Sequence, residues 1–166
     1  MGFIVGVVMA LVVSSSAFAP GGTVPARFSC DGADRSPPLT WSGMPHGAVT
    51  FALIVDDPDA PGGTWVHWVL FNLPASVAAL PEGVPAAGDL PQLGGALQGR
   101  NDFGKLGYGG PCPPPGRAHR YFFRLYALDA ALPLRAGTGR REVESAMRGH
   151  VVGEATLMGT YARGGR

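Results

Sequence analysis

Five polar side chains whose chemistry suits ligand binding fall in two stretches of the chain. Asp57, Asp59 and His67 belong to the first stretch, and His119 and Tyr121 belong to the second. Histidine N–H groups and a tyrosine hydroxyl donate hydrogen bonds to anions, whereas carboxylates orient histidines or bind an ammonium group. If the fold brings the two stretches together, we expect a site for a small phosphorylated or anionic ligand.

Charge signs extend this hypothesis and leave alternatives open. Donors on one side and carboxylates on the other are complementary to a zwitterion such as a phosphoethanolamine head group. The same residues would also serve as a buried polar network that only fixes the core. A third interpretation is a regulatory module that uses this site to dock a protein partner.

Catalysis is a weaker alternative. Two aspartates and two histidines are ligands that a divalent metal accepts, and a His–Asp pair can act as a general base, so a metal-dependent hydrolase is conceivable. However, the sequence has neither a closely spaced set of metal ligands nor a Gly-x-Ser-x-Gly nucleophile elbow. We therefore expect a binding protein and not an enzyme, with no catalytic residue, no metal and no cofactor.

Two apolar runs around an acidic turn position the first set of residues. Residues 51–55 are apolar and rich in β-forming residues, which predicts a buried strand. Residues 56–63 contain two prolines and two glycines that turn the chain, and residues 66–73 are the next predicted strand. Alternation along this strand places His67 on one face with three apolar residues: Val69, Phe71 and Leu73.

The second set of residues begins a strand predicted over residues 119–128. His119 and Tyr121 alternate with Arg120, and the same alternation continues to the end of the run. The arginines mark their face as the one nearer to water. His119 and Tyr121 are therefore expected at the leading end of the apolar face, near a pocket mouth.

A loop rich in glycine and proline, residues 107–116, precedes this strand. Glycines let a backbone approach a ligand closely and point its N–H groups at an anion. The prolines leave few donors, chiefly Gly109, Gly110 and Cys112. The loop therefore predicts either an anion-binding nest or a rigid turn that joins two strands.

Composition indicates one folded, loop-rich domain. The chain has 166 residues, of which 46% are hydrophobic, with 26 glycines and 16 prolines between apolar runs. Many short strands with such turns predict an all-β sandwich or barrel. The net charge is +1 and there is no basic patch with interleaved aromatic residues, so no nucleic-acid partner is expected.

Three further segments complete the expected fold. Residues 74–99 have little periodicity and are predicted to be a surface loop, and residues 140–149 form a short amphipathic helix that ends at a glycine. Residues 151–161 are the predicted last strand. His150, at the helix end, is expected to make local hydrogen bonds and to be structural.

The two cysteines, Cys30 and Cys112, are too few for a disulfide framework or a closed zinc site. From the cysteine count we expect two reduced thiols, with a single bridge as the alternative.

The N-terminal apolar run, residues 3–13, is too short to span a bilayer, so no stable membrane insertion is expected. A secretory signal would open with positive charge, yet the first basic residue is Arg27. We expect residues 10–14 to form the first strand of a cytoplasmic protein. The alternative is cleavage after Ala19 and a periplasmic or secreted location.

Two motif pairs give the chain a family resemblance. Asp57–Pro61 followed by Trp65–Trp68, and Gly107–Pro114 followed by His119–Tyr121, resemble the phosphatidylethanolamine-binding protein (PEBP) family. The resemblance is strongest to its bacterial Raf-kinase-inhibitor-like branch. Weaker matches extend it over nearly the whole chain: residues 14–18, 30–32, 36–39 and 149–161.

The resemblance implies a mainly β protein: an antiparallel β-sandwich with a short C-terminal helix and long Gly/Pro-rich loops. It implies one domain over residues 10–163, with residues 1–9 as an extension or a mis-assigned start, and a binding or regulatory, kinase-inhibitor-like role. A homodimer is compatible with this branch. The implied anion or head-group pocket contains Asp57, Asp59, His67, Gly110, Pro111, His119 and Tyr121.

Overall fold

The computed structural model describes residues 9–164 as a mainly β protein with one short α-helix. In chain order the elements are β1 (Val12–Ser14), the 3-10 helix η1 (Ala26–Phe28), β2 (Leu39–Ser42), β3 (Thr50–Asp57), β4 (Trp65–Pro74), β5 (Ala79–Leu80), β6 (Asp89–Leu90), the 3-10 helix η2 (Pro91–Leu93), β7 (Ala96–Gln98), β8 (His119–Leu128), α1 (Arg140–Met147) and β9 (Val151–Tyr161).

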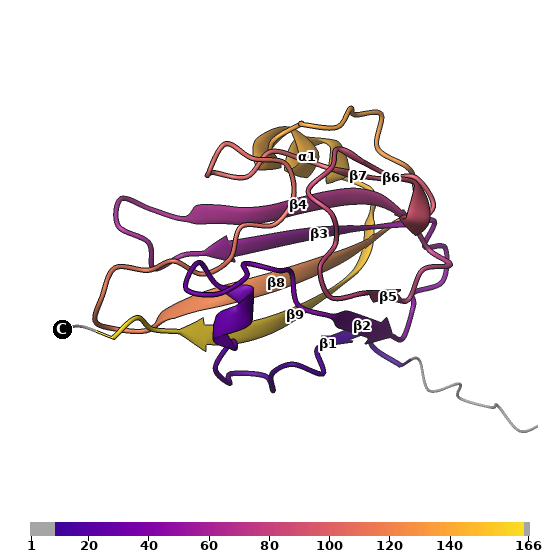
Figure 1. Cartoon of the computed structure of the whole chain (residues 1–166). Helices are drawn as coiled ribbons and strands as arrows, with labels where there is room; N and C mark the ends of the chain where they lie inside the picture. Colours follow the sequence, from indigo (N-terminus) through magenta and orange to yellow (C-terminus); the bar gives the residue numbers. More distant parts are fainter. Residues whose placement is uncertain (1–8, 165–166) are drawn as a thin grey trace, which may run out of the picture.

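The strands form two antiparallel sheets that pack face to face. The large sheet has the order β6-β7-β4-β3-β8-β9 and the small sheet has the order β1-β2-β5. Figure 1 shows the small sheet against one face of the large sheet and α1 against the opposite face. The expected antiparallel sandwich with a short C-terminal helix is confirmed.

Two hydrophobic cores lie on the two faces of the large sheet. The inner core, between the sheets, takes alternate residues of the central strands, including Leu53, Trp68 and Phe123. The outer core lies under α1 and contains Ile54 and Val143. Because both faces of β3 are covered, all eight of its residues are buried. In the sequence, the strand is therefore a continuous apolar run between Thr50 and its two terminal aspartates.

The predictions that rest on alternation within a single strand are confirmed for the last two strands of the chain. β9 has the predicted bounds, and β8 alternates between buried and more exposed residues as expected. The prediction of an unstructured surface loop over residues 74–99 is wrong in part, because this segment contains β5, β6, β7 and η2. Those strands are only two or three residues long, so pairing with neighbours defines them and local pattern does not.

The expected first strand is present, although it is shorter than predicted. β1 pairs with β2 and places Val13 in the inner core, and Phe18 packs in the same core. Cleavage after Ala19 would remove both side chains. Residues 1–8, most of the expected N-terminal extension, lie outside the described residues. No helix within residues 9–164 is long and apolar enough to cross a membrane.

The expectation of two reduced thiols is wrong, because Cys30 and Cys112 form a disulfide. Their Cα atoms are 5.4 Å apart, a usual separation for a bridge. The fold places the turn after η1 beside the loop of residues 107–116, although 82 positions separate the two cysteines. The cysteine count carries no information on this long-range pairing.

Reducing the disulfide is expected to lower the free energy of unfolding by about 2–4 kcal/mol, because a bridge across so long a segment restricts the unfolded chain. Urea denaturation with and without dithiothreitol measures the change. A variant with both Cys30→Ser and Cys112→Ser is the matched control and should show the lower stability in both conditions. Equal midpoints for the oxidised and reduced protein would contradict the prediction.

Candidate functional site

A cavity of about 300 Å³ opens where the ends of β3 and β4 meet the start of β8. Four of the predicted site residues line it together: Asp57, His67, His119 and Tyr121. The rest of its lining is mainly apolar and comes from the first residue of β4 and from three loops: Trp65, then Ala60, Pro61, Phe103, Cys112, Pro113 and Pro114. The cavity thus combines a polar floor with an apolar mouth, as small-molecule sites commonly do.

A β-bulge points His67 into this cavity. In the pairing of β3 with β4, Val55 lies opposite Trp68 and Asp56 lies opposite Val66, so His67 is the extra residue. The prediction that His67 shares a face with Val69 and Phe71 is therefore wrong, because both lie in the outer core. Leu73 does lie in the inner core, because a second register shift between Phe51 and Leu53 restores its face. The ring of His67 packs edge-on to Tyr121, with centroids 5.2 Å apart, on the side of the inner core.

The loop of residues 107–116 fixes the ring of His67. Nδ1 lies 2.7 Å from the carbonyl oxygen of Gly109, and the Gly109 amide donates to the His67 carbonyl at 2.8 Å. A carbonyl can only accept, so Nδ1 carries the hydrogen. Burial lowers the pKa of His67, although the Gly109 bond and the charge of Asp57 act in the opposite direction. The neutral ring then presents the lone pair of Nε2.

His119 is oriented by a buried carboxylate. Its Nδ1 donates to Oδ2 of Asp57 at 2.7 Å, and both side chains are less than a tenth exposed. Oδ1 of Asp57 accepts the backbone N–H of Asp59 at 2.8 Å, which also fixes the start of the turn after β3. With Nδ1–H held in this way, Nε2 of His119 donates only when the ring carries both protons.

Tyr121 contributes a hydroxyl that has no partner in the protein. The residue is 1% exposed, and its hydroxyl oxygen has no hydrogen bond within residues 9–164. Burial, and then the nearby charge of Asp57, raise the pKa of Tyr121 far above its usual value, so the hydroxyl keeps its proton. A buried polar group without a partner is costly, and Tyr121 is one of the residues that line the cavity.

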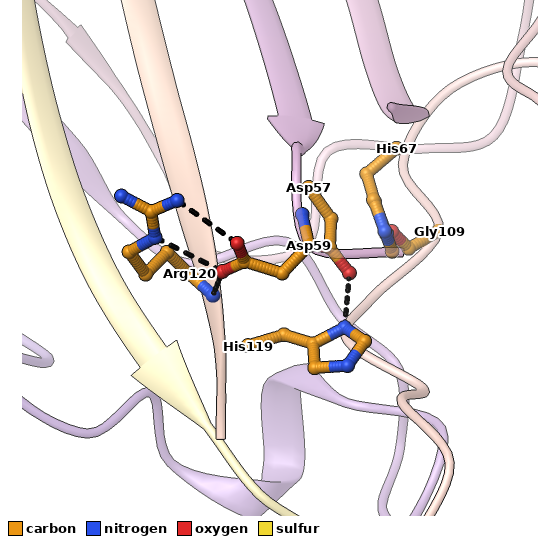
Figure 2. A network of polar contacts seen from close by, with 6 residues as sticks. All are labelled: Asp57, Asp59, His67, Gly109, His119 and Arg120. Atoms are coloured by element: carbon orange, nitrogen blue, oxygen red, sulfur yellow. Dashed lines mark hydrogen bonds and ion pairs between the residues drawn. The ribbon is translucent and has the colours of Figure 1, made fainter. Parts of the chain in front are cut away.

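Asp59 lies next to the site and not in its lining. Its carboxylate accepts two hydrogen bonds from the Arg120 guanidinium, at 3.0 and 2.9 Å, and one from the Arg120 backbone amide at 2.9 Å. Figure 2 shows this carboxylate turned toward Arg120 and away from His67. The guanidinium bonds lower the pKa of Asp59 to about 2. Alternation along the strand predicts only that Arg120 lies on the face nearer to water, so it predicts no partner for Asp59.

The Gly109 and Gly110 amides are used within the protein, which favours the rigid turn over the anion nest for this part of the loop. The Gly109 amide donates to His67, and the Gly110 amide donates to Oδ1 of Asp34 at 2.8 Å. A side chain at Gly110 would collide with the Phe28 carbonyl and with Asp34, so close packing requires this glycine. Pro111 is buried and accepts the Cys30 amide through its carbonyl. Gly110 and Pro111 therefore support the loop and do not line the main cavity.

Two aromatic residues at the cavity mouth were not among the predicted site residues. Trp65 is 38% exposed and Phe103 is 40% exposed, and their rings meet edge to face at 5.5 Å. Trp65 lies within a motif that the resemblance used, whereas Phe103 comes from a loop with no pattern that would place it there. Trp68, in contrast, is fully buried and donates to Gln98.

Potential metal ligands do not gather in groups of three. Among residues 9–164, no set of three or more His, Cys, Asp and Glu side chains is arranged to hold a metal ion. His150, expected to be structural, forms a hydrogen bond of 2.8 Å with Asp129 at the surface.

Two packed antiparallel sheets with a polar-floored cavity at the end of the central strands define a small β-sandwich binding protein. The chain belongs to the phosphatidylethanolamine-binding protein family, whose family model matches residues 14–162. The family expected from the sequence motifs is confirmed.

Relatives from archaea and bacteria align over nearly the whole domain. A UPF0098 protein of Methanothermobacter thermautotrophicus is 55% identical over 92% of this chain and 99% of its own length. Among solved structures, the PEBP homologue CT736 of Chlamydia trachomatis has a TM-score of 0.83 at 40% identity, with 93% and 98% of the two chains covered. Escherichia coli YbcL has a TM-score of 0.87 at 35% identity, with 93% and 99% covered.

The Asp59–Arg120 pair predicts a specific acid response. Because the pKa of Asp59 is lowered from 3.8 to about 2 in the folded protein, its contribution to stability is complete above about pH 4 and is lost as the pH falls toward 2. Asp59→Asn should therefore flatten the decrease in stability between pH 5 and pH 2.5, measured by urea denaturation. Arg120→Gln is the matched control and should flatten the same window. An unchanged acid response in both variants would rule out this pairing.

Proposed function

We propose that this protein binds a small phosphorylated or anionic ligand in the cavity formed by Asp57, His67, His119 and Tyr121. Three groups of the floor have hydrogen-bonding capacity that no residue in the described range, 9–164, uses: Nε2 of His67, Nε2 of His119 and the hydroxyl of Tyr121. They come from β4 and β8, the two strands that pair with β3 on either side, so the sheet fixes their relative positions. A tetrahedral oxyanion offers oxygen atoms in several directions and so suits three converging groups.

The buried hydroxyl of Tyr121 is the observation that carries this proposal. A structural network would satisfy its members, and the carboxylates and the histidine Nδ1 atoms of this site are indeed satisfied. Among residues 9–164 the hydroxyl of Tyr121 has no hydrogen-bond partner, at 1% residue exposure. A ligand oxygen would remove that cost, which supports a binding site over a purely structural network.

The pairing of both carboxylates changes what the ligand should look like. Asp59 is neutralised by Arg120, and both oxygens of Asp57 already accept hydrogen bonds. An ammonium group would therefore gain little in this cavity. We propose that the anionic part of a ligand supplies most of the affinity and that phosphate and phosphoethanolamine bind within about fivefold of each other, the equivalent of ~1 kcal/mol.

A regulatory role with a protein partner remains the second proposal. The exposed edge-to-face pair of Trp65 and Phe103 beside the cavity favours it, because aromatic residues are enriched where proteins dock. A kinase-inhibitor-like role, a cytoplasmic location, a homodimer and the absence of catalysis stay predictions. A pull-down that compares the native protein with Trp65→Ala measures whether a partner depends on this mouth.

Tyr121→Phe is expected to separate stability from binding. The variant should be as stable as the native protein, or more stable by about 1 kcal/mol, because it removes a buried hydroxyl that has no partner. Phosphate affinity should fall roughly 10- to 100-fold, because a hydrogen bond to a charged ligand is lost. Calorimetric titration and urea denaturation measure the two quantities. A variant that is less stable and binds phosphate normally would show that Tyr121 is structural.

Sulfate and phosphate should differ because His67 is neutral. At pH 7.5 hydrogen phosphate keeps an O–H that donates to Nε2 of His67, whereas sulfate has no donor, so phosphate should bind on the order of tenfold more tightly. Sulfate gains a donor at this ring only when the ring takes up a proton from solvent, and burial lowers the pKa of the ring below 6.5, so sulfate affinity should rise as the pH falls below neutral.

The fluorescence of Trp65 provides the signal for this titration, since Trp65 lines the cavity and Trp68 is fully buried away from solvent. Trp65→Phe is the control for the signal, and His67→Ala is the control for the mechanism. His67→Ala should bind both anions weakly and with equal affinity. A preference for sulfate at pH 7.5 in the native protein would contradict a neutral His67.

A further inference from the structure

The disulfide lies in the wall of the ligand cavity. Cys112 lines the main cavity and also a second cavity of about 250 Å³, and Cys30 lines the second cavity. Both cysteine residues are exposed. A thiol from solution can therefore reach the bridge in the folded protein, which most buried structural disulfides do not allow.

The bridge joins the turn after η1 to the loop that holds His67. Three hydrogen bonds span the same junction: Tyr108 hydroxyl to the Phe28 carbonyl at 2.6 Å, Gly110 amide to Asp34 at 2.8 Å, and Cys30 amide to the Pro111 carbonyl at 3.0 Å. These bonds do not depend on the sulfur atoms. They should keep the first part of the loop, residues 108–111, and with it the Gly109 contact to His67, in place when the bridge opens.

The second part of the loop, residues 112–116, has fewer hydrogen bonds and depends more on the disulfide. Pro113, Pro114 and Pro115 have no N–H, and the Cys112 amide makes no hydrogen bond within residues 9–164. The next amide that donates is that of Gly116, to the Arg163 carbonyl at 3.1 Å. The Cys112 sulfur is thus the covalent anchor between Pro111 and the point where Pro115 pairs with Arg163 in an isolated β-bridge. This run includes Pro113 and Pro114, which form part of the main cavity wall.

We propose that the Cys30–Cys112 disulfide is a thiol-exchange site whose reduction loosens the wall of the main cavity and weakens ligand binding. The predicted change in ligand affinity rests on the proposed function, whereas the predicted loosening of the loop does not depend on any ligand. The redox partner is a dithiol reductant. A reducing compartment keeps such dithiols available, so the compartment would set the ratio of oxidised to reduced protein. The two forms would differ in ligand affinity because only the oxidised form has a fixed cavity wall.

The exchange balances with a dithiol as the only co-reactant. A thiolate of the dithiol attacks one sulfur of the bridge, forms a mixed disulfide and releases the other cysteine as a thiolate, which takes up a proton. The second thiol of the reductant, as its thiolate, then displaces the remaining cysteine and closes a cyclic disulfide. Two electrons and two protons pass to the protein, which gains two thiols, and the dithiol is oxidised.

The test measures phosphate affinity and loop order in the full chain, oxidised and after dithiothreitol. Phosphate affinity should fall on the order of tenfold on reduction, because the wall is no longer pre-organised, and return when the bridge is re-formed. Amide exchange at Gly116 should become faster on reduction, whereas exchange at Gly109 should change less. Circular dichroism confirms that the reduced protein stays folded.

The variant with both Cys30→Ser and Cys112→Ser is the matched control. It should bind phosphate as weakly as the reduced protein and should not respond to dithiothreitol. Equal affinity and equal Gly116 exchange in the oxidised and reduced protein would overturn the inference, as would a bridge that dithiothreitol opens only after unfolding. If the oxidised protein binds no phosphate, the proposed function fails, and the exchange of Gly116 alone decides the redox inference.

Discussion

The carboxylate of Asp57 is the contact on which the polar end of the sandwich depends. It ends β3, holds His119 of the neighbouring β8 at 2.7 Å and accepts the amide that begins the following turn. That turn delivers Asp59 to Arg120. The side chain of Asp57 is 5% exposed, so its charge is tolerated only while these donors remain in place. One buried charge therefore fixes a histidine, a turn and a surface ion pair.

The other half of the site is held by backbone contacts. The β-bulge in β4 turns His67 toward the cavity, and the loop of residues 107–116 fixes its ring through Gly109. The disulfide and close packing at Gly110 fix that loop in turn. The two histidines thus receive different environments, a carboxylate for His119 and a carbonyl for His67. Their Nε2 atoms and the Tyr121 hydroxyl are the groups to which we assign the proposed ligand.

Features that follow from local pattern could be predicted from the sequence. Alternation placed His119 and Tyr121 on the inner face of β8, and β9 has the predicted bounds. The face of His67 could not be predicted, because one extra residue in a strand reverses alternation and leaves no local signal. The disulfide and the Asp59–Arg120 pair join residues 82 and 61 positions apart, so they depend on the folded topology. The motifs include four residues that line the cavity, but they do not separate lining residues from supporting ones.

Nitrogen-15 NMR of the two histidine rings during a phosphate titration tests the central claim most directly. In the free protein both rings should carry a proton on Nδ1, as their contacts with Gly109 and Asp57 require. Phosphate should shift the Nε2 signals of His67 and His119 saturably and with one dissociation constant, while the Nδ1 protons stay in place. Nε2 signals that do not respond to phosphate would contradict a ligand site at this end of the sandwich.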